Sequence, residues 1–498
     1  MLDLLAAPPH VDVLYVGAHP DDEYQSLSTF GQWKERDGIG TGVVTVTRGE
    51  GGGNAAGPEK GAALGRIREA EERKAVAFAG VEHVFQLGEP DFWYTLSAPL
   101  TARVWGPDTL RRLVEVIRAT TPSTVVTMDP RPFNQHGGHQ LAARLAVEAF
   151  RLAADPAAFP GTGSPWRASR LLTQNWGLRG PKGPGCATAG LRDPATGLPQ
   201  IGVWEGTWSA RHRATWAQRE RDAERTYRTQ GFAARPAKAR GPFGCDWFSV
   251  LADGGRPVRA PVVEQAGLRP LYAEFRDWAR AVGLPWLANR AQPDYPEPPA
   301  TTLPAASRAP VVDGARSPGE YAGPRLRLAH WEGERCRTTA DCAATARFAR
   351  HGDDLYVLVE VTDDARGAAL RECERHWRTD AVEVALDPRG DADDTSTTFK
   401  LGVLPFTSAG GPCAARDADA RQGPAPRVRV ASALRRGGYT VEVRIPFALL
   451  PGRPVALRAN ILVYDSDTRD RTGQTRLAWS AFGSAQADPY VWGRVGRG

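Results

Sequence analysis

The sequence has no stretch of 18 apolar residues, no block of five or six like charges and no internal repeat. The first absence argues against a membrane-spanning segment, because a helix needs about 20 apolar residues to cross a bilayer. The second argues against a nucleic-acid-binding tail, so no nucleic acid partner is expected. No two cysteines form a C-x-x-C pair, which argues against a zinc site built from cysteines.

The beginning of the chain also lacks the features of a signal peptide. Residues Met1 to Pro9 contain neither a positively charged region nor a long apolar core. Such a segment is compatible with the start of a mature exported protein and with a cytoplasmic start. The six cysteines are an even number, which agrees with disulfides formed in an oxidising compartment. We therefore predict a secreted or cell-surface protein, with a cytoplasmic protein as the alternative.

The composition is that of a globular protein with more than one domain. Of the 498 residues, 42% are hydrophobic and 24% are charged, which is ordinary for such proteins. At roughly 100–200 residues per domain, this length predicts two or three domains. The net charge of +6 comes mainly from arginines scattered along the chain and says little about partners.

Strand and helix patterns alternate over the first 150 residues. Short apolar, β-branched runs predict strands at Val11–Gly17, Gly42–Thr47, His83–Leu87 and Ser123–Met128. Helical patterns predict helices at Gly61–Ala79, at Asp108–Ala119 with Asp108 as N-cap candidate, and after His139. This alternation predicts an α/β fold with a parallel sheet, in which ligands bind beyond the carboxyl ends of the strands.

The rest of the chain predicts loops, a linker and a second domain. Residues 160–200, rich in Gly and Pro, predict long loops, and Ala210–Gln230 predicts a charged helix. The proline-rich residues 291–311 predict an extended linker that follows a first domain of residues 1–290.

Residues 312–498 carry strand patterns in which apolar and polar residues alternate. The clearest of these patterns are at Leu355–Val361, Ala381–Leu386, Tyr439–Ile445 and Ala459–Tyr464. They predict an all-β domain with an antiparallel β-sandwich. Four of the six cysteines fall after residue 330, where disulfides would staple this domain.

Polar residues that can carry chemistry follow the first and the fourth predicted strand. The first strand runs into His19-Pro20-Asp21-Asp22-Glu23, and the fourth leads to His136-Gly137-Gly138-His139. Parallel strands that lie side by side end at the same edge of a sheet. The sequence therefore predicts that His19, Asp22 and His139 come together.

This set of residues predicts a metal site with a water-activating role. Two imidazoles and one carboxylate are the protein ligands of many catalytic zinc sites, where zinc lowers the pKa of a bound water to about 7. Asp21 lies beside a predicted ligand and is suited to take a proton from that water. His136 is suited to donate a proton or to stabilise an oxyanion.

Each of the two motifs also has a purely structural interpretation. Asp21 or Asp22 can cap a helix after a turn, and the histidines of the second motif can simply face water. Three of the nine histidines, however, fall at the ends of two predicted strands. Taken together, the two motifs favour the metal site.

The segment Ala18-His19-Pro20-Asp21-Asp22-Glu23 resembles the hallmark of the PIG-L (LmbE-like) deacetylase family. Similar pieces are Arg48-Gly49-Glu50, Leu64-Gly65-Arg66-Ile67-Arg68-Glu69 and Leu87-Gly88-Glu89-Pro90-Asp91. The resemblance is strong over residues 10–150 and extends more loosely to about 290. It implies a Rossmann-like fold and an enzyme that hydrolyses the acetamide of N-acetylglucosamine derivatives, usually with zinc.

The same resemblance implies roles for individual residues. It implies zinc binding by His19, Asp22 and His139, with Asp21 as the base and His136 as the acid or oxyanion group. It also implies that Arg66 and Asp91 contact the sugar, which rests on the resemblance alone. Arg66 can instead be a helix-surface arginine, and Asp91 a turn aspartate.

The second motif departs from the family pattern at one position. The family usually has an aspartate where this chain has Gly138, and that aspartate is expected to orient the first histidine. The departure puts the role of His136 in doubt but leaves the metal ligands in place. Asp129, just upstream, is a candidate to substitute for the missing carboxylate.

From Val312 onward, the chain resembles a family 9 carbohydrate-binding module. The matching pieces include Asp354-Leu355-Tyr356-Val357 and Thr379-Asp380-Ala381-Val382-Glu383-Val384. Such modules stack sugar rings on aromatic faces, so Trp377, Trp479 and Trp492 become candidates, although each can instead fill a core. Some of these modules carry calcium. Asp363 and Asp364 could bind it, although solvated turns are the alternative.

The sequence thus predicts a zinc-dependent enzyme that removes the acetyl group from an N-acetylglucosamine-containing glycan or glycoconjugate. Its C-terminal domain is expected to bind a glycan. An amidase for small sugar–thiol conjugates and a non-catalytic glycan-binding protein remain as alternatives. Another divalent metal, such as iron, cobalt or nickel, suits the same ligands as zinc.

Overall fold

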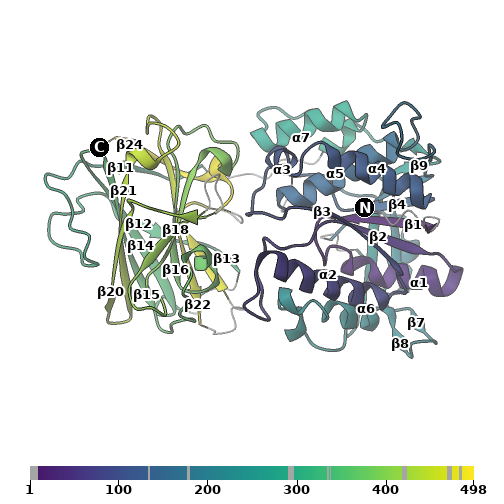
Figure 1. Cartoon of the computed structure of the whole chain (residues 1–498), viewed down its shortest axis with the longest axis horizontal. Coiled ribbons are helices and arrows are strands. Elements are labelled where there is room, and N and C mark those ends of the chain that lie inside the picture. Colours follow the sequence, from purple (N-terminus) through teal and green to yellow (C-terminus); the bar gives the residue numbers. More distant parts are fainter. Residues whose placement is uncertain are drawn as a thin grey trace. The chain divides into compact units, whose positions relative to one another are not determined.

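The computed structural model describes residues 9–132, 135–176, 180–289, 297–333, 336, 338–417, 423–467, 474–481 and 485–497. Contacts divide the chain into two compact units, one formed almost entirely by residues before 293 and the other by residues after 292 (Figure 1). Among the helices in these ranges, none is long and apolar enough to cross a bilayer.

The N-terminal unit is built on a mainly parallel sheet with the strand order β10-β9-β5-β4-β1-β2-β3, and β6 pairs with β9. β1 pairs in parallel with β2 on one side and with β4 on the other, whereas β9 runs antiparallel to β5. The strands are β1 (Val13–Gly17), β2 (Thr41–Thr47), β3 (His83–Glu89), β4 (Thr124–Thr127), β5 (Arg170–Gln174), β6 (Gln200–Trp204), β9 (Cys245–Asp253) and β10 (Arg256–Pro257). The four strands predicted in the first 150 residues are confirmed.

Helices cover both faces of this sheet (Figure 1). One face packs against α1 (Leu27–Asp37), α2 (Gly61–Ala77) and α6 (Trp216–Glu224), and the other against α3 (Ala98–Trp105), α4 (Asp108–Thr120), α5 (Gly137–Leu152) and α7 (Pro270–Ala281). The alternation of β1 explains this arrangement. Leu14 and Val16 join the core under α4 and α5, and Val13 and Tyr15 join the core under α1 and α2.

Three details of the sequence prediction are wrong in this unit. Residue Pro107, not Asp108, is the N-cap of α4, so Asp108 lies in the first turn. The predicted helix Ala210–Gln230 is shorter, because Thr215 caps α6 by accepting a hydrogen bond from the Gln218 backbone nitrogen at 3.2 Å. The region expected to form long loops contains β5, which lies inside the sheet.

The C-terminal unit is a β-sandwich, as predicted. One sheet has the order β11-β24-β22-β16-β17-β18-β19, with β23 paired to β22 and β13 paired to β23, and the other has the order β12-β14-β15-β21-β20. The strands are β11 (Ala300–Leu303), β12 (Leu326–Leu328), β13 (His330–Gly333), β14 (Cys342–His351), β15 (Asp354–Asp363), β16 (Ala381–Asp387), β17 (Phe399–Leu404), β18 (Cys413–Arg416), β19 (Gly423–Pro424), β20 (Arg429–Arg435), β21 (Gly438–Pro446), β22 (Arg458–Ser466), β23 (Gln474–Ala478) and β24 (Gly493–Arg497). Buried side chains such as Val357, Val384 and Ile461 fill the space between the sheets.

The predicted linker, residues 291–311, is only partly described, because residues 291–296 lie outside the described ranges. Residues Ala300–Leu303, which the composition assigns to this linker, instead form the edge strand β11 and pair in parallel with β24. This strand contains no proline, so its backbone N–H groups can take part in pairing.

All six cysteines form disulfides in the structure. Cys186 pairs with Cys245 in the N-terminal unit, and the pairs Cys336–Cys342 and Cys373–Cys413 lie in the β-sandwich. The expectation that disulfides staple the second domain is confirmed.

Candidate active site

The loop after β1 holds a carboxylate in a fixed position. Asp22 is 4% exposed, and its Oδ2 accepts hydrogen bonds from the backbone nitrogens of Ala18 at 2.6 Å and His19 at 2.8 Å. The Tyr15 hydroxyl donates to the backbone oxygen of Asp22 at 2.8 Å. Asp21 has a φ of 126°, a conformation that is costly for a residue with a Cβ and that recurs at functional sites.

The loop after β4 brings two histidines to the same edge. His136 is the N-cap residue of α5, and His139 lies in the first turn of that helix. Because β1 and β4 are paired neighbours, His139 Nε2 lies 3.0 Å from Asp22 Oδ1, and His19 Nδ1 lies 3.7 Å from Asp22 Oδ2. The structure thus brings together the three residues predicted as metal ligands.

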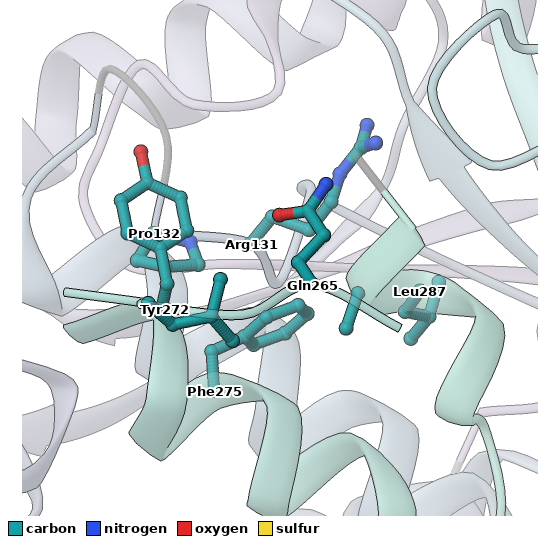
Figure 2. A pocket seen from close by; sticks show the side chains of 8 residues that line it. Arg131, Pro132, Gln265, Tyr272, Phe275 and Leu287 are labelled. Carbon is teal, nitrogen blue, oxygen red and sulfur yellow. The ribbon is translucent and has the colours of Figure 1, made fainter. Parts of the chain in front are cut away.

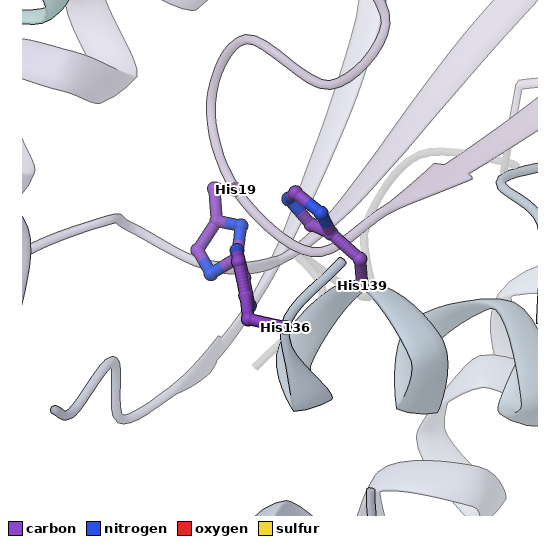
Figure 3. Close-up of side chains that lie close together, drawn as sticks. All are labelled: His19, His136 and His139. Carbon is purple, nitrogen blue, oxygen red and sulfur yellow. The ribbon is translucent and has the colours of Figure 1, made fainter. Parts of the chain in front are cut away.

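The three imidazole rings gather around one space (Figure 3). The ring centroids of His19 and His136 are 4.8 Å apart, those of His19 and His139 5.1 Å, and those of His136 and His139 3.8 Å. Each ring offers a nitrogen, and these nitrogens lie within 4.8 Å of one another. His139 Nδ1 is buried and has no hydrogen-bond partner among the described residues. This donor set, imidazole nitrogens beside the Asp22 carboxylate, fits a divalent transition metal such as zinc.

The pKa values of Asp21 and His136 are shifted in opposite directions. Burial, and then the charge of Asp22, raise the pKa of Asp21 well above its usual range. Burial, and then the charges of His139 and His19, lower the pKa of His136 well below its usual value. A carboxylate with a raised pKa is a stronger base than an ordinary one.

Asp91 lies on the far side of the His19 ring from Asp22. Its Oδ1 is 3.5 Å from His19 Nε2, and its Oδ2 accepts a hydrogen bond from the Gly51 backbone nitrogen at 3.1 Å. Although burial lowers the pKa of His19, the hydrogen bond and charge of Asp91, together with the charge of Asp22, raise it to about 9. The resemblance implied a sugar contact for Asp91, whereas the structure gives it a contact with a predicted metal ligand.

Of the two arginines in the α2 motif, the structure places Arg68 and not Arg66 near the site. Arg66 is exposed on the surface of α2, and the sugar contact that the resemblance implied for it stays a prediction. Arg68 is buried and donates to the backbone oxygens of Gly49 and Gly53, each at 2.6 Å. Its positive charge acts on both Asp21 and Asp91.

Gly138 lies directly against the histidine rings. A Cβ at this position would be 3.1 Å from His19 Cε1 and 3.2 Å from His136 Nδ1, so the imidazoles would have to move by a few tenths of an ångström to admit a side chain. Asp129 was expected to substitute for the missing carboxylate. Both of its oxygens instead bind the Arg131 side chain, at 2.5–2.8 Å, so this expectation is not supported.

Arg131 also lines a small pocket together with Pro132, Gln265, Tyr272, Phe275 and Leu287 (Figure 2). The cavity measures about 20 Å³. That volume holds about one water molecule and is far below the 300–1,000 Å³ or so of ordinary ligand sites. It is therefore not a substrate pocket.

The sequence prediction missed Trp176. This residue follows β5, and its ring lies 5.4 Å from the His139 ring at an interplanar angle of 87°. It is 40% exposed, whereas the three neighbouring imidazoles are partly buried. The available signal was an aromatic residue three positions after the short run Leu171–Thr173, within the region expected to form loops.

Of the three tryptophans predicted to bind sugar in the C-terminal unit, only Trp377 remains accessible. It is half-buried in the short helix η6 (Cys373–Arg378). Trp479 is 6% exposed in the core between the sheets, where its ring lies 6.3 Å from that of Phe348. Trp492 is fully buried. The predicted sugar contact of Trp479 is therefore wrong, because neither face of its ring is available.

Asp363 and Asp364 belong to two different carboxylate groups. Asp363 lies with Asp465 and Asp467, and Asp364 lies with Asp341 and Asp467. Acidic groups are common without a bound ion, so calcium binding stays a prediction.

Comparisons with known proteins agree with the two resemblances. Residues 14–150 match the family model of GlcNAc-PI de-N-acetylases (PIG-L), and residues 324–496 match that of carbohydrate family 9 binding domain-like proteins. Two proteins named 1D-myo-inositol 2-acetamido-2-deoxy-alpha-D-glucopyranoside deacetylase are similar to this chain. The one from Thermomonospora curvata is 35% identical over 175 residues, and the one from Thermobispora bispora is 37% identical over 177 residues.

Each of these matches covers 32% of this chain, and the chain spans 58% and 57% of the length of these curated relatives. A solved family 9 module from Caldicellulosiruptor kristjanssonii in complex with cellotriose is 18% identical, with a TM-score of 0.31, over 39% of this chain and 93% of that one. The chain therefore joins an N-terminal domain that is similar to the PIG-L deacetylases to a C-terminal domain that resembles the family 9 carbohydrate-binding domains.

Proposed function

We propose that this protein is a zinc-dependent hydrolase that removes the acetyl group from an N-acetylglucosamine-containing glycan or glycoconjugate. The observation that carries the proposal is the meeting of His19, Asp22 and His139 at one sheet edge, with Asp21 beside them. The family match and the names of the relatives, which are deacetylases of an acetamido sugar, support the substrate class.

In this proposal, His19, Asp22 and His139 hold the metal. A bound zinc ion supplies Lewis-acid chemistry, which polarises the amide carbonyl and makes water nucleophilic near neutral pH. Asp22 Oδ1 faces His139, while its Oδ2 is fixed by two backbone nitrogens, so the carboxylate is oriented before any ligand arrives. Such preorganisation lowers the cost of forming the site.

The other residues move protons and stabilise charge. Asp21 accepts a proton from the attacking water, and the water oxygen forms a bond to the carbonyl carbon of the acetyl group. His136 lies at the start of α5, where an imidazole N–H can donate a hydrogen bond to the developing oxyanion. Breakage of the C–N bond then releases acetate and a free amine, and the amine takes up one proton.

The C-terminal domain is proposed to bind a glycan through Trp377. A tethered binding domain raises the local concentration of substrate at the catalytic domain. Export is also proposed, because three disulfides are expected in an oxidising compartment and not in the cytoplasm.

The test measures acetate released from N-acetylglucosamine oligomers by the zinc-loaded full chain. We compare the protein with Asp21→Ala and with Asp37→Ala, which alters an exposed aspartate that pairs with its neighbour Arg36. We expect Asp21→Ala to lose 100-fold or more of the rate, since a general base contributes about 10²–10⁴-fold, and Asp37→Ala to lose none. Equal activity of all three proteins would refute the role of Asp21. Zinc binding without acetate release would refute the substrate class.

A further inference from the structure

Trp176 stands at the same sheet edge as the candidate metal ligands. It follows β5, which pairs in parallel with β4, so the loops after these two strands leave the sheet side by side. The Trp176 ring is nearly perpendicular to the His139 ring, with centroids 5.4 Å apart. An aromatic side chain therefore borders the site on the β5 side.

The exposure of Trp176 is difficult to explain by packing. Tryptophan has the largest side chain, and leaving it exposed forgoes the stabilisation of burying its apolar surface. Trp176 nevertheless remains 40% exposed, while Trp105, Trp216, Trp247 and Trp286 of the same unit are at most 7% exposed. Its exposed surface is thus available to a ligand that reaches the histidines.

Exposure alone does not identify a ligand site, because Trp208 is 62% exposed. Trp208 lies on β7 (Trp208–Ser209), which pairs with β8 (Ala214–Thr215) in a small separate sheet. What distinguishes Trp176 is its contact with His139. The two tryptophans thus form a natural pair for comparison.

The chemistry of an indole surface selects a class of ligand. The face of the ring carries partial negative charge and attracts weakly positive C–H groups. A pyranose ring offers such C–H groups on one face and hydroxyls around its rim, so it can cover the indole and stay hydrated at its edges. Anionic or fully polar groups gain much less from the same surface.

We propose that Trp176 is the sugar-binding platform of the active site, on which the pyranose ring that bears the acetamido group stacks. This inference rests on the proposed function and adds the residue that selects a pyranoside. Stacking places the acetamido group next to His139 and its neighbours His19 and Asp22. Trp176 then contributes to substrate binding and orientation and takes no part in proton transfer.

The experiment compares Trp176→Ala and Trp176→Phe with the matched control Trp208→Ala in the zinc-loaded full chain. We measure KM and kcat for release of acetate from the N-acetylglucosamine dimer, and zinc affinity by competition with a chelator. We expect Trp176→Ala to raise KM up to about tenfold, because the variant lacks the aromatic face on which the sugar ring stacks. Trp176→Phe should keep most of the affinity for sugar, and Trp208→Ala should behave as the unchanged protein.

The zinc affinity of Trp176→Ala distinguishes a residue that stacks on the sugar from one that only supports His139. If Trp176→Ala weakens zinc binding as His139→Ala does, Trp176 merely supports His139 and the inference is overturned. An unchanged KM, or an equal rise in Trp208→Ala, overturns it as well.

A binding measurement separates this inference from the proposed function. Asp21→Ala combined with Trp377→Ala removes turnover and the candidate sugar site of the C-terminal domain, and binding of the dimer is then measured by calorimetry. Loss of binding on adding Trp176→Ala supports the platform even where the unchanged protein releases no acetate. Binding that persists contradicts it.

Discussion

Replacement of Asp91 is predicted to weaken metal binding rather than sugar binding. The carboxylate lies 3.5 Å from His19 Nε2, on the side of the ring opposite the nitrogen that faces Asp22. A carboxylate in this position favours the tautomer with a proton on Nε2 and leaves Nδ1 to the metal. Asp91 is thus a positioning residue that acts through His19.

The structure also bounds the size of the effect. Loss of a partner of this kind commonly costs 10–100-fold in metal affinity. Because the contact of 3.5 Å is long for a hydrogen bond, we expect the lower end for Asp91→Ala, about tenfold, or roughly 1.4 kcal/mol. Asp91→Asn should lose several-fold. Its single acceptor oxygen can serve either His19 or the Gly51 N–H, whereas the carboxylate serves both.

The assay is competition between the full chain and a chelator for zinc, followed by kinetics at saturating zinc. We expect excess zinc to restore most of kcat in both variants and KM for the sugar to change less than threefold. Asp37→Ala serves as the control with an exposed aspartate. An unchanged zinc affinity together with a raised KM would refute this reasoning and restore the sugar contact that the family resemblance implied.

Two further predictions concern the C-terminal domain. Trp377→Ala should abolish glycan binding measured by calorimetry and leave thermal stability nearly unchanged. Trp479→Ala should instead lower the free energy of unfolding by about 3–5 kcal/mol, because it empties a core position. The opposite pattern would show that the two roles are exchanged. Stability of this domain should fall as pH drops from about 4.5 to about 2, because Glu383, despite its burial, has its pKa lowered to about 2 by Lys400 and His376. A depressed pKa means that the stabilising charge is present at higher pH and lost on acidification, so a flat melting temperature across this range would contradict the assignment.

The sequence predicts the metal cluster because only two strand ends are needed to build it. His19 and Asp22 follow β1, His139 follows β4, and both strands carry clear apolar patterns. The sheet order that makes them neighbours is the usual one for alternating strands and helices. β5 and Trp176 were missed because the segment between Phe159 and Pro199 is rich in Gly and Pro, a composition that hides one short strand.

The motif alone does not tell which of Arg66 and Arg68 faces the sheet; the position of each residue around the helix axis does. Residues two positions apart on a helix differ by about 200°, so only one of the two arginines can face the sheet. Leu64, Arg68 and Glu72 are buried at intervals of four residues, which places Arg68 on the inner face of α2. This periodicity was present in the sequence, and the family motif obscured it.

The alternation of side chains along a strand places Trp479 in the core, whereas it cannot place Trp377. Leu477 at the end of β23 belongs to the core between the two sheets, and Ala478 belongs to a cluster on the opposite face. Alternation therefore returns residue 479 to the inner core, where Trp479 is found. Trp377 lies in η6, outside any strand, so no parity assigns it to a face. Its accessibility follows only from the folded structure, and the sequence could not have distinguished it from a core residue.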